Sequence, residues 1–411
     1  MRVVHLSTTD MGGAYEAAQR ISDCLTTEGM DSEVIVRTKF RENTLTIPFY
    51  NTIPQKFVSK IKNFFNLILS NGDVVIDKYG ADICKHPHVQ SADIICLHWV
   101  NSFVSNSEVK KILDLGKPVF WIMHDMWPFT GGCHYAGDCV NYVNECTQCP
   151  MVCKHKTEKV HYWHNRKKEC FGAENLFPIG PSRWISDCAK KSKIFQNQEI
   201  TTISNPINVD IFYPKNILEK KEIREKYGLS EKKSTILFAA AKVTNPIKGF
   251  SYFVDAVKKL SADQFQILVL GENVQGDILK QSVDLEVVYT GFVKNSKQLC
   301  NIYNAADLLV APSLQENYSN TVLESLACGI PAVVFDVGGM KDLVETGKNG
   351  YLAKLKDIDD LANGIVKVSN NKEMLGQMAR EKVLMQNDYS VIAHKYRVLF
   401  QQKLLKEEKY E

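Results

Sequence analysis

The sequence predicts an α/β protein made of two doubly wound domains, each with a parallel sheet. At 411 residues, the chain is longer than one hydrophobic core normally serves. Short continuous apolar runs, such as 308–310 and 332–335, fit strands that are buried on both faces of a parallel sheet. These runs alternate with helical patterns, as parallel strands require. We expect domains at 1–207 and 208–388, followed by a terminal helix at 389–411.

The composition is that of an ordinary soluble protein, with 45% hydrophobic and 24% charged residues. A formal net charge of +3 gives no sign of a nucleic-acid partner. Residues 2–7 look like a first strand and not a signal peptide, and no apolar run is long enough to span a bilayer. We therefore expect a cytoplasmic protein, either free or held at the inner face of the cytoplasmic membrane. The twelve cysteines are then not expected to form disulfides.

The most informative stretch runs from 307 to 339. Asn320 and Thr321 open a predicted helix between two predicted strands. A helix start at a strand end offers unpaired N–H groups and a positive dipole end, which suit a phosphate. Glu316 precedes this helix and Glu324 lies within it, and each carboxylate can accept hydrogen bonds from two neighbouring sugar hydroxyls. The alternative is a pair of solvated glutamates near a helix N-terminus, which the dipole favours anyway.

The whole stretch resembles the donor-site motif of family-4 retaining glycosyltransferases, which have the two-domain GT-B fold. The resemblance is carried by Glu316 and Glu324, with seven residues between them, then by the sequence SLACGIPAV and a Gly-Gly turn. It implies two domains that face each other across a cleft, with Glu324 on the donor ribose and Glu316 on the donor sugar. It also implies that amides near Asn320, Thr321 and Val322 contact the diphosphate.

Two lysines follow the predicted strand at 234–241. Solvated surface charge is the usual role of lysine, and it is the alternative here. The sequence Lys248-Gly-Phe matches a family element that holds the donor diphosphate, and Lys242 stands roughly where the family has an arginine. Lysine supplies a point charge to phosphate but not a bidentate fork. The resemblance therefore implies that Lys248, with Glu316 and His124, is catalytic, and that Lys242 assists in donor binding.

The candidate site residues of the first half follow predicted strands. Gly12 and Gly13 form a strand-to-helix turn that lets the backbone approach a ligand closely, and they resemble the family's first loop. His124 matches the family's cleft histidine, which lies near the transferred sugar; a structural histidine is the alternative. His98 is a weaker candidate, and Asp125 is expected to orient the His124 imidazole.

A cysteine-rich insertion spans 131–156. Four cysteines within a short, loop-forming span can hold a tetrahedral Zn²⁺: Cys133, Cys139, Cys146 and Cys149. Cys153, His134 and His155 are spare candidates for ligands. We expect a structural zinc site that staples this loop; free thiols, or disulfides in an oxidising compartment, are the alternatives. The run from His124 into these cysteines resembles a subset of family-4 enzymes that build bacterial capsule, exopolysaccharide or O-antigen.

Residues 54–70 predict a basic amphipathic helix. Its apolar residues recur at helical spacing, with lysines between them. We expect these apolar side chains to face the core. Peripheral contact with an anionic membrane is the alternative.

The resemblance covers nearly the whole chain and implies a reaction. A hexose would move with retention from a UDP-sugar or GDP-sugar to an acceptor hydroxyl, which we expect on a lipid-linked glycan. No metal or other cofactor is expected to be required for catalysis, and the helix at 389–411 would cross back to the first domain. Two other functions stay open: a nucleotide-sugar epimerase on the same fold, and a non-catalytic glycan-binding protein.

Overall fold

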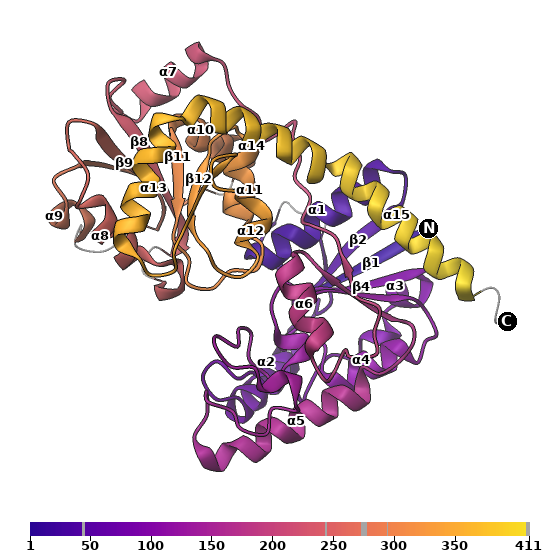
Figure 1. The fold of residues 1–411 in the computed structure, drawn as a ribbon. Coiled ribbons are helices and arrows are strands. Elements are labelled where there is room, and N and C mark those ends of the chain that lie inside the picture. Colours follow the sequence, from indigo (N-terminus) through magenta and orange to yellow (C-terminus); the bar gives the residue numbers. More distant parts are fainter. Residues whose placement is uncertain (43–45, 243–244, 273–277, 294, 408–411) are drawn as a thin grey trace. The chain divides into compact units, whose positions relative to one another are not determined.

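The computed structural model describes residues 1–42, 46–242, 245–272, 278–293 and 295–407. The chain folds into two units (Figure 1). Unit 1 comprises Met1–Pro206 and the terminal segment that begins at Tyr389, and unit 2 comprises Ile207–Asp388. Each unit contains a parallel sheet covered by helices, so the predicted fold class is confirmed.

Unit 1 is built on a seven-stranded parallel sheet in the order β3-β2-β1-β4-β5-β6-β7. Its strands β1, β4 and β5 are buried almost throughout, because helices cover both faces. The strands are β1 (Arg2–Thr9), β2 (Asp31–Thr38), β3 (Ile47–Pro48), β4 (Ile94–Leu97), β5 (Val119–Ile122), β6 (Leu176–Gly180) and β7 (Thr201–Thr202).

The helices of unit 1 come from both ends of the chain. They are α1 (Gly13–Thr27), α2 (Ile53–Leu69), α3 (Pro87–Ser91), α4 (Asn106–Leu113), α5 (Thr157–Cys170), α6 (Arg183–Lys191) and α15 (Tyr389–Glu407), with short 3-10 turns η1 (Ile83–Lys85), η2 (Trp127–Phe129), η3 (Asn141–Val143) and η4 (Lys154–Lys156). The terminal helix α15 packs on this unit. Its Phe400 ring lies 4.6 Å from the Phe120 ring of β5, and Ile392, Ala393 and Tyr396 join the same buried cluster.

Unit 2 has a six-stranded parallel sheet in the order β10-β9-β8-β11-β12-β13. The strands are β8 (Ser234–Lys242), β9 (Phe265–Glu272), β10 (Glu286–Gly291), β11 (Leu308–Ala311), β12 (Ala332–Phe335) and β13 (Gly350–Ala353). The helices are α7 (Ile217–Lys226), α8 (Phe250–Val257), α9 (Ile278–Ser282), α10 (Ser296–Ala305), α11 (Asn320–Ala327), α12 (Met340–Leu343), α13 (Ile358–Asn370) and α14 (Lys372–Gln386), with the 3-10 turn η5 (Pro246–Lys248).

The strand orders locate where each unit can bind a ligand. In unit 1 the chain order reverses between β1 and β4, and in unit 2 it reverses between β8 and β11. At such a switch point the connections leave to opposite sides, which opens a crevice outside the carboxyl ends of the two strands. The predicted donor residues follow β8 and β11, and Gly12, Gly13 and His124 follow β1 and β5.

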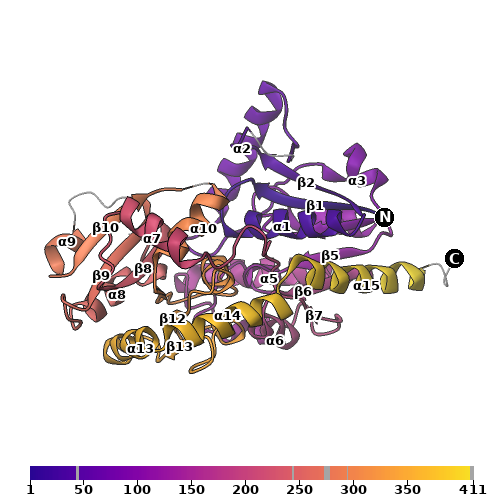
Figure 2. The same ribbon diagram turned by 90° about the horizontal axis from the view of Figure 1, so that it is seen from above.

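Helix α2 corrects the prediction for 54–70. Its apolar side chains are exposed: Ile53 is 84%, Phe57 62% and Leu67 64% exposed. The helix buries the polar Asn66 instead, which donates to the Tyr79 carbonyl at 2.8 Å and accepts from the Tyr79 N–H at 3.0 Å. Figure 2 shows α2 standing out from the sheet of its unit. The core-facing orientation that we expected is therefore wrong.

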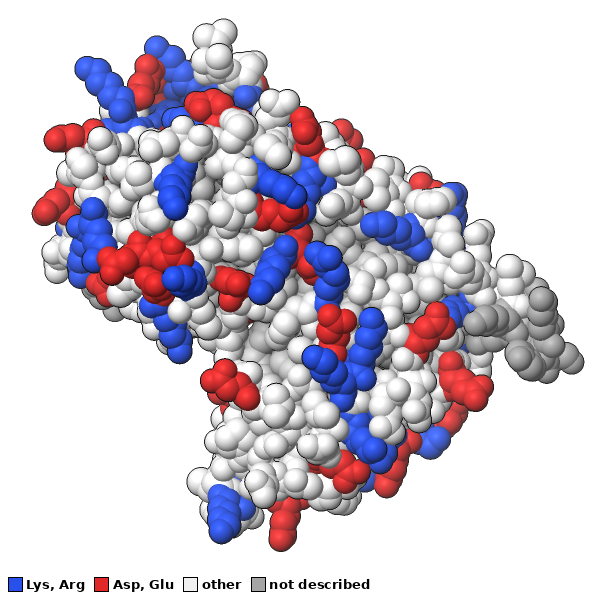
Figure 3. Space-filling view, in the orientation of Figure 1, with Lys and Arg blue, Asp and Glu red and all other residues white. Residues whose placement is uncertain are grey.

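The described helices include none that is both long and apolar enough to cross a membrane. On the face drawn in Figure 3, basic and acidic side chains are interspersed. This pattern agrees with the small net charge of +3.

Candidate donor and catalytic sites

In unit 2, the loops that follow β8 and β11 are locked together. Gly249 closes the η5 turn with φ +68°, and a Cβ placed on it would lie 1.9 Å from the Pro312 carbonyl oxygen. The Leu314 N–H donates to the Ile247 carbonyl at 2.8 Å. Only glycine combines this left-handed conformation with so close an approach of two backbones. The Lys248-Gly-Phe element is thus held directly against the loop that carries Glu316.

This contact brings two predicted site residues together. Lys248 Nζ donates to Glu316 Oε2 at 2.8 Å, with the lysine side chain 36% and the glutamate side chain 13% exposed. The Gly339 N–H of the Gly-Gly turn donates to the Glu316 carbonyl at 3.2 Å, which fixes the glutamate backbone. Lys242 ends β8 and its side chain is exposed. An anion at this edge would therefore meet positive charge from the β8 side.

Helix α11 starts at the predicted place, and its first turn is capped. Ser319 is the N-cap residue, and its hydroxyl accepts from the Val322 N–H at 3.4 Å. Asn320 and Thr321 occupy the first two helical positions. The Val322 amide, which we expected to contact a diphosphate, is thus engaged by the cap. The dipole of α11 still places positive potential at this end of the helix.

Glu324 is oriented by a residue that the sequence analysis did not identify. It is buried within α11, and its Oε2 accepts a hydrogen bond from the Tyr303 hydroxyl of α10 at 2.7 Å. Tyr303 itself is 1% exposed. A buried carboxylate needs such a donor, because desolvation without a partner is costly. Glu324 therefore has a fixed rotamer, as a ligand-binding carboxylate requires.

In unit 1, the turn after β1 requires glycine at one of the two predicted positions. Gly12 has φ +86° and caps α1, which begins at Gly13. The Gly12 carbonyl accepts from the Glu16 N–H at 3.1 Å. A Cβ on Gly12 would meet no atom within 4 Å, so the glycine serves its left-handed conformation and not close packing within the unit.

His124 belongs to a chain of three histidines on adjacent strands. His5 Nδ1 lies 2.8 Å from His98 Nε2, and His98 Nδ1 lies 2.9 Å from His124 Nε2. Burial lowers the pKa of His5 to about 3 and that of His124 to about 4, and burial also lowers the pKa of His98. The three imidazoles are therefore neutral at pH 7, and each ring fixes the tautomer of the next.

Asp125, which we expected to orient His124, also contacts two other residues. Its carboxylate accepts from the Trp127 N–H at 2.8 Å and lies 2.6 Å from His134 Nδ1. The nearby carboxylate raises the pKa of His134, although burial opposes it. His98, the weaker site candidate of the sequence analysis, contacts His124 directly.

The four cysteines proposed as zinc ligands line one cavity of about 20 Å³. Burial raises the pKa of Cys133 to about 11 and that of Cys146 to about 12, so these groups are thiols in the metal-free protein. In the part of the chain that the structure describes, no three His, Cys, Asp or Glu side chains already stand as a metal site. A Zn²⁺ ion would need the thiols to move inward and lose their protons.

Comparison with solved structures identifies the fold. A sucrose-phosphate synthase from Thermosynechococcus elongatus matches with a TM-score of 0.69 and 18% identity, over 98% of this chain and 99% of the other. HepE from Anabaena, solved in complex with UDP-glucose, matches with a TM-score of 0.66 and 15% identity, over 98% of this chain and 100% of the other. The fold is that of the GT-B glycosyltransferases.

The family follows from the sequence of unit 2. Residues 233–371 match the family described as "Glycosyl transferases group 1", so this part of the chain, which includes the candidate donor site, is a domain of that family. A UDP-Gal:alpha-D-GlcNAc-diphosphoundecaprenol alpha-1,3-galactosyltransferase from Escherichia coli is 26% identical over 209 residues, 47% of this chain and 51% of the relative. The chain spans about half the length of the first curated relatives it matches.

Proposed function

We propose that this protein is a retaining glycosyltransferase that moves a hexose from a nucleoside-diphosphate sugar to an acceptor hydroxyl. The observation that carries the proposal is the Lys248–Glu316 pair at the switch point of unit 2, beside the start of α11. It joins a cation suited to a diphosphate with a carboxylate suited to sugar hydroxyls. Support for a UDP-sugar donor comes from HepE, which was solved with UDP-glucose, and from the Escherichia coli relative, whose name specifies UDP-Gal; a GDP-sugar is the other candidate.

Each residue has a role that its surroundings support. Lys248, Lys242 and the N-terminus of α11 would stabilise the negative charge that develops on the leaving diphosphate. Glu316 would hold the sugar hydroxyls and Glu324 the ribose. Positioning and electrostatics then supply the catalysis, with the acceptor attacking the face from which the diphosphate departs.

His124 is proposed to act as a neutral hydrogen-bonding group near the transferred sugar. Burial keeps its pKa at about 4, so the ring carries no charge at pH 7. A neutral imidazole can donate to or accept from a sugar hydroxyl. Gly12 and Gly13 would let the first loop approach the diphosphate and the acceptor.

The acceptor is proposed to be a lipid-linked glycan at the inner face of the cytoplasmic membrane. The support is α2, which buries Asn66 and exposes apolar side chains together with Lys56 and Lys60. Such a helix suits an anionic leaflet, where apolar residues enter the interface and lysines meet phosphate. Assembly of a surface polysaccharide such as capsule, exopolysaccharide or O-antigen is the corresponding process.

Nucleotide binding tests the donor site directly. Calorimetric titration with UDP, GDP and ADP should show selective binding of one nucleotide, weakened at least about tenfold in Glu324→Ala. Glu373→Ala, which removes an exposed glutamate from the same unit, is the matched control and should bind normally. If folded protein binds none of the three, the transferase proposal fails and glycan binding without turnover is favoured. If the protein epimerises the nucleotide sugar and transfers no sugar to an acceptor, the alternative function of an epimerase would be supported.

A structural zinc ion is proposed for the cysteine loop, supported by the four thiols around one cavity. Elemental analysis of protein produced with zinc should find about one Zn²⁺ per chain. The double variant Cys146→Ser/Cys149→Ser should lose the metal, whereas Cys153→Ser, an exposed cysteine outside the cavity, should keep it. Zinc-free wild type would refute the site, and thiol titration would then separate free thiols from disulfides.

A further inference from the structure

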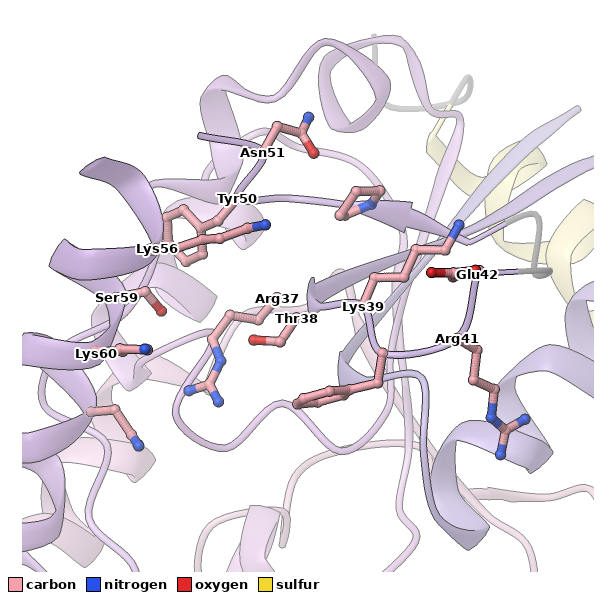
Figure 4. Close-up of a pocket in the computed structure, with 13 residues that line it drawn as sticks. Arg37, Thr38, Lys39, Arg41, Glu42, Tyr50, Asn51, Lys56, Ser59 and Lys60 are labelled. Carbon is pink, nitrogen blue, oxygen red and sulfur yellow. The ribbon is translucent and has the colours of Figure 1, made fainter. Parts of the chain in front are cut away.

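Unit 1 contains a basic cavity that the sequence analysis did not anticipate. Its volume is about 640 Å³, within the usual range for small-molecule sites. Five of its lining residues are basic and one, Glu42, is acidic, so the cavity favours an anion. The basic residues come from the end of β2, the following loop and α2: Arg37, Lys39, Arg41, Lys56 and Lys60. Figure 4 shows Arg37 extending from β2 toward α2, where Lys60 lies.

The loop that forms one wall of the cavity is held by a buried carboxylate. Asp10, which follows β1, accepts from the Phe40 N–H at 2.8 Å and from the Arg41 N–H at 2.7 Å. Asp10 is fully buried, so both bonds are protected from water. Arg41 pairs with Glu16 of α1 at 2.6 Å, which leaves less of its charge for a ligand. The wall is thus built and not merely a surface loop.

Arg37, Lys56 and Lys60 keep more of their charge for a ligand. Arg37 Nη1 donates to the Ser102 carbonyl at 2.7 Å, and its buried Nε has no hydrogen-bond partner among the described residues. In the same described set, Lys56 and Lys60 form no ion pair. They are four residues apart on α2 and therefore lie on one side of the helix. A phosphate would meet several N–H donors here.

The cavity lies at the edge of the sheet that carries the candidate site residues of unit 1. It opens beyond the carboxyl ends of β2 and β3, the same edge of the parallel sheet at which β1 leads to Gly12 and β5 leads to His124. Along α2, the apolar residues Phe57 and Ile61 directly follow the two lysines and are exposed. A cationic surface, which can bind an anion, and an apolar surface are thus adjacent on one helix.

We propose that this cavity binds the phosphate or diphosphate group that joins the acceptor glycan to its lipid, while the exposed side of α2 lies in the membrane. The inference rests on the proposed function and names the part of the acceptor that unit 1 recognises. Phosphate chemistry is shared by the headgroups of ordinary anionic phospholipids, and the experiment must separate the two sources.

Vesicle binding provides that separation. Wild type and Lys56→Gln/Lys60→Gln would be sedimented with phosphatidylcholine vesicles that contain polyprenyl diphosphate, or phosphatidylglycerol at equal total charge. Wild type should prefer the diphosphate lipid, and the double variant should lose about tenfold or more of that affinity. Lys85→Gln/Lys110→Gln removes the same charge from exposed positions of unit 1 outside the cavity and should behave as wild type.

Each outcome decides the proposal. If the double variant loses binding equally to both kinds of anionic vesicle, the lysines attract any charged surface and the diphosphate site is refuted. Unchanged binding of the double variant to the diphosphate lipid would also refute the site. Nucleotide titration of the same proteins separates a failure of the cavity proposal from a failure of the donor site. Normal nucleotide binding with no preference for the diphosphate lipid refutes the cavity alone, whereas wild type that binds no nucleotide refutes the proposed function itself.

Discussion

Acid should destabilise unit 1 through the histidine chain, because His5, His98 and His124 are held neutral in the folded protein. An unfolded histidine has a pKa of 6.5, whereas burial lowers the folded pKa to about 3 for His5 and about 4 for His124. Below pH 6.5 the unfolded state therefore binds protons that the folded state does not. The contribution of these neutral histidines to the free energy of unfolding is complete above pH 6.5 and is lost as the pH falls toward their folded pKa values.

The expected size follows from this difference. Between pH 7 and pH 5, protonation of the unfolded chain at His5 lowers the free energy of unfolding by about 2 kcal/mol, and His124 contributes about the same. His5→Gln removes one titrating group. The substitution will lower the free energy of unfolding at every pH. The difference in this free energy between wild type and variant should nevertheless narrow by about 2 kcal/mol from pH 7 to pH 5.

Tryptophan fluorescence during urea unfolding reports this unit alone, because all five tryptophans lie within Met1–Pro206. His86 and His164 also have lowered pKa values, and His134 has a raised one. These three histidines contribute equally to the pH dependence of unfolding in wild type and variant, so the difference between the two proteins isolates His5. A gap that stays constant across this pH range would refute the reasoning, since His5 would then take up its proton inside the folded protein.

Two further substitutions probe unit 2. Gly249→Ala should lower its free energy of unfolding by about 3 kcal/mol, because the new Cβ would lie 1.9 Å from the Pro312 oxygen; Gly347→Ala, with φ +79° but open space, should cost only about 1 kcal/mol. Circular dichroism during urea unfolding measures both, and equal costs would mean that the loop relaxes. Tyr303→Phe should cost about 1–3 kcal/mol by removing the hydroxyl that donates to the buried Glu324 carboxylate, and should weaken nucleotide binding several-fold in calorimetry. Unchanged affinity would show that Glu324 needs no such support.

Local sequence signals predicted the parallel sheets well. The apolar run at 332–335 coincides with β12, and the helix expected from Asn320 begins there as α11. Both signals are local: a buried strand must be apolar along its length, and a helix start needs a capping residue. The strand β2 went unrecognised although Val34, Ile35 and Val36 form a similar apolar run, since charged neighbours flank it on both sides.

The side-chain partners could not be predicted, because they join distant parts of the chain. His98 is 93 residues from His5 and 26 from His124, and the contacts follow from strand order, which no local pattern encodes. The prediction for helix α2 was wrong for a related reason. Periodicity identifies which residues share a side of a helix, but not whether protein or solvent covers that side. The basic cavity likewise combines β2 with α2, and neither segment alone predicts it.

The ion pair between Lys248 and Glu316 has a consequence for turnover. The two charges satisfy each other at 2.8 Å, so in the proposed enzyme a nucleotide sugar would have to replace the partner of each charge at once. After transfer, the remaining nucleoside diphosphate carries no hexose to occupy Glu316. The carboxylate is then free to compete with the diphosphate for Lys248, which weakens retention of the spent product. In the proposed enzyme, the contact that closes the empty site would therefore also help to clear it.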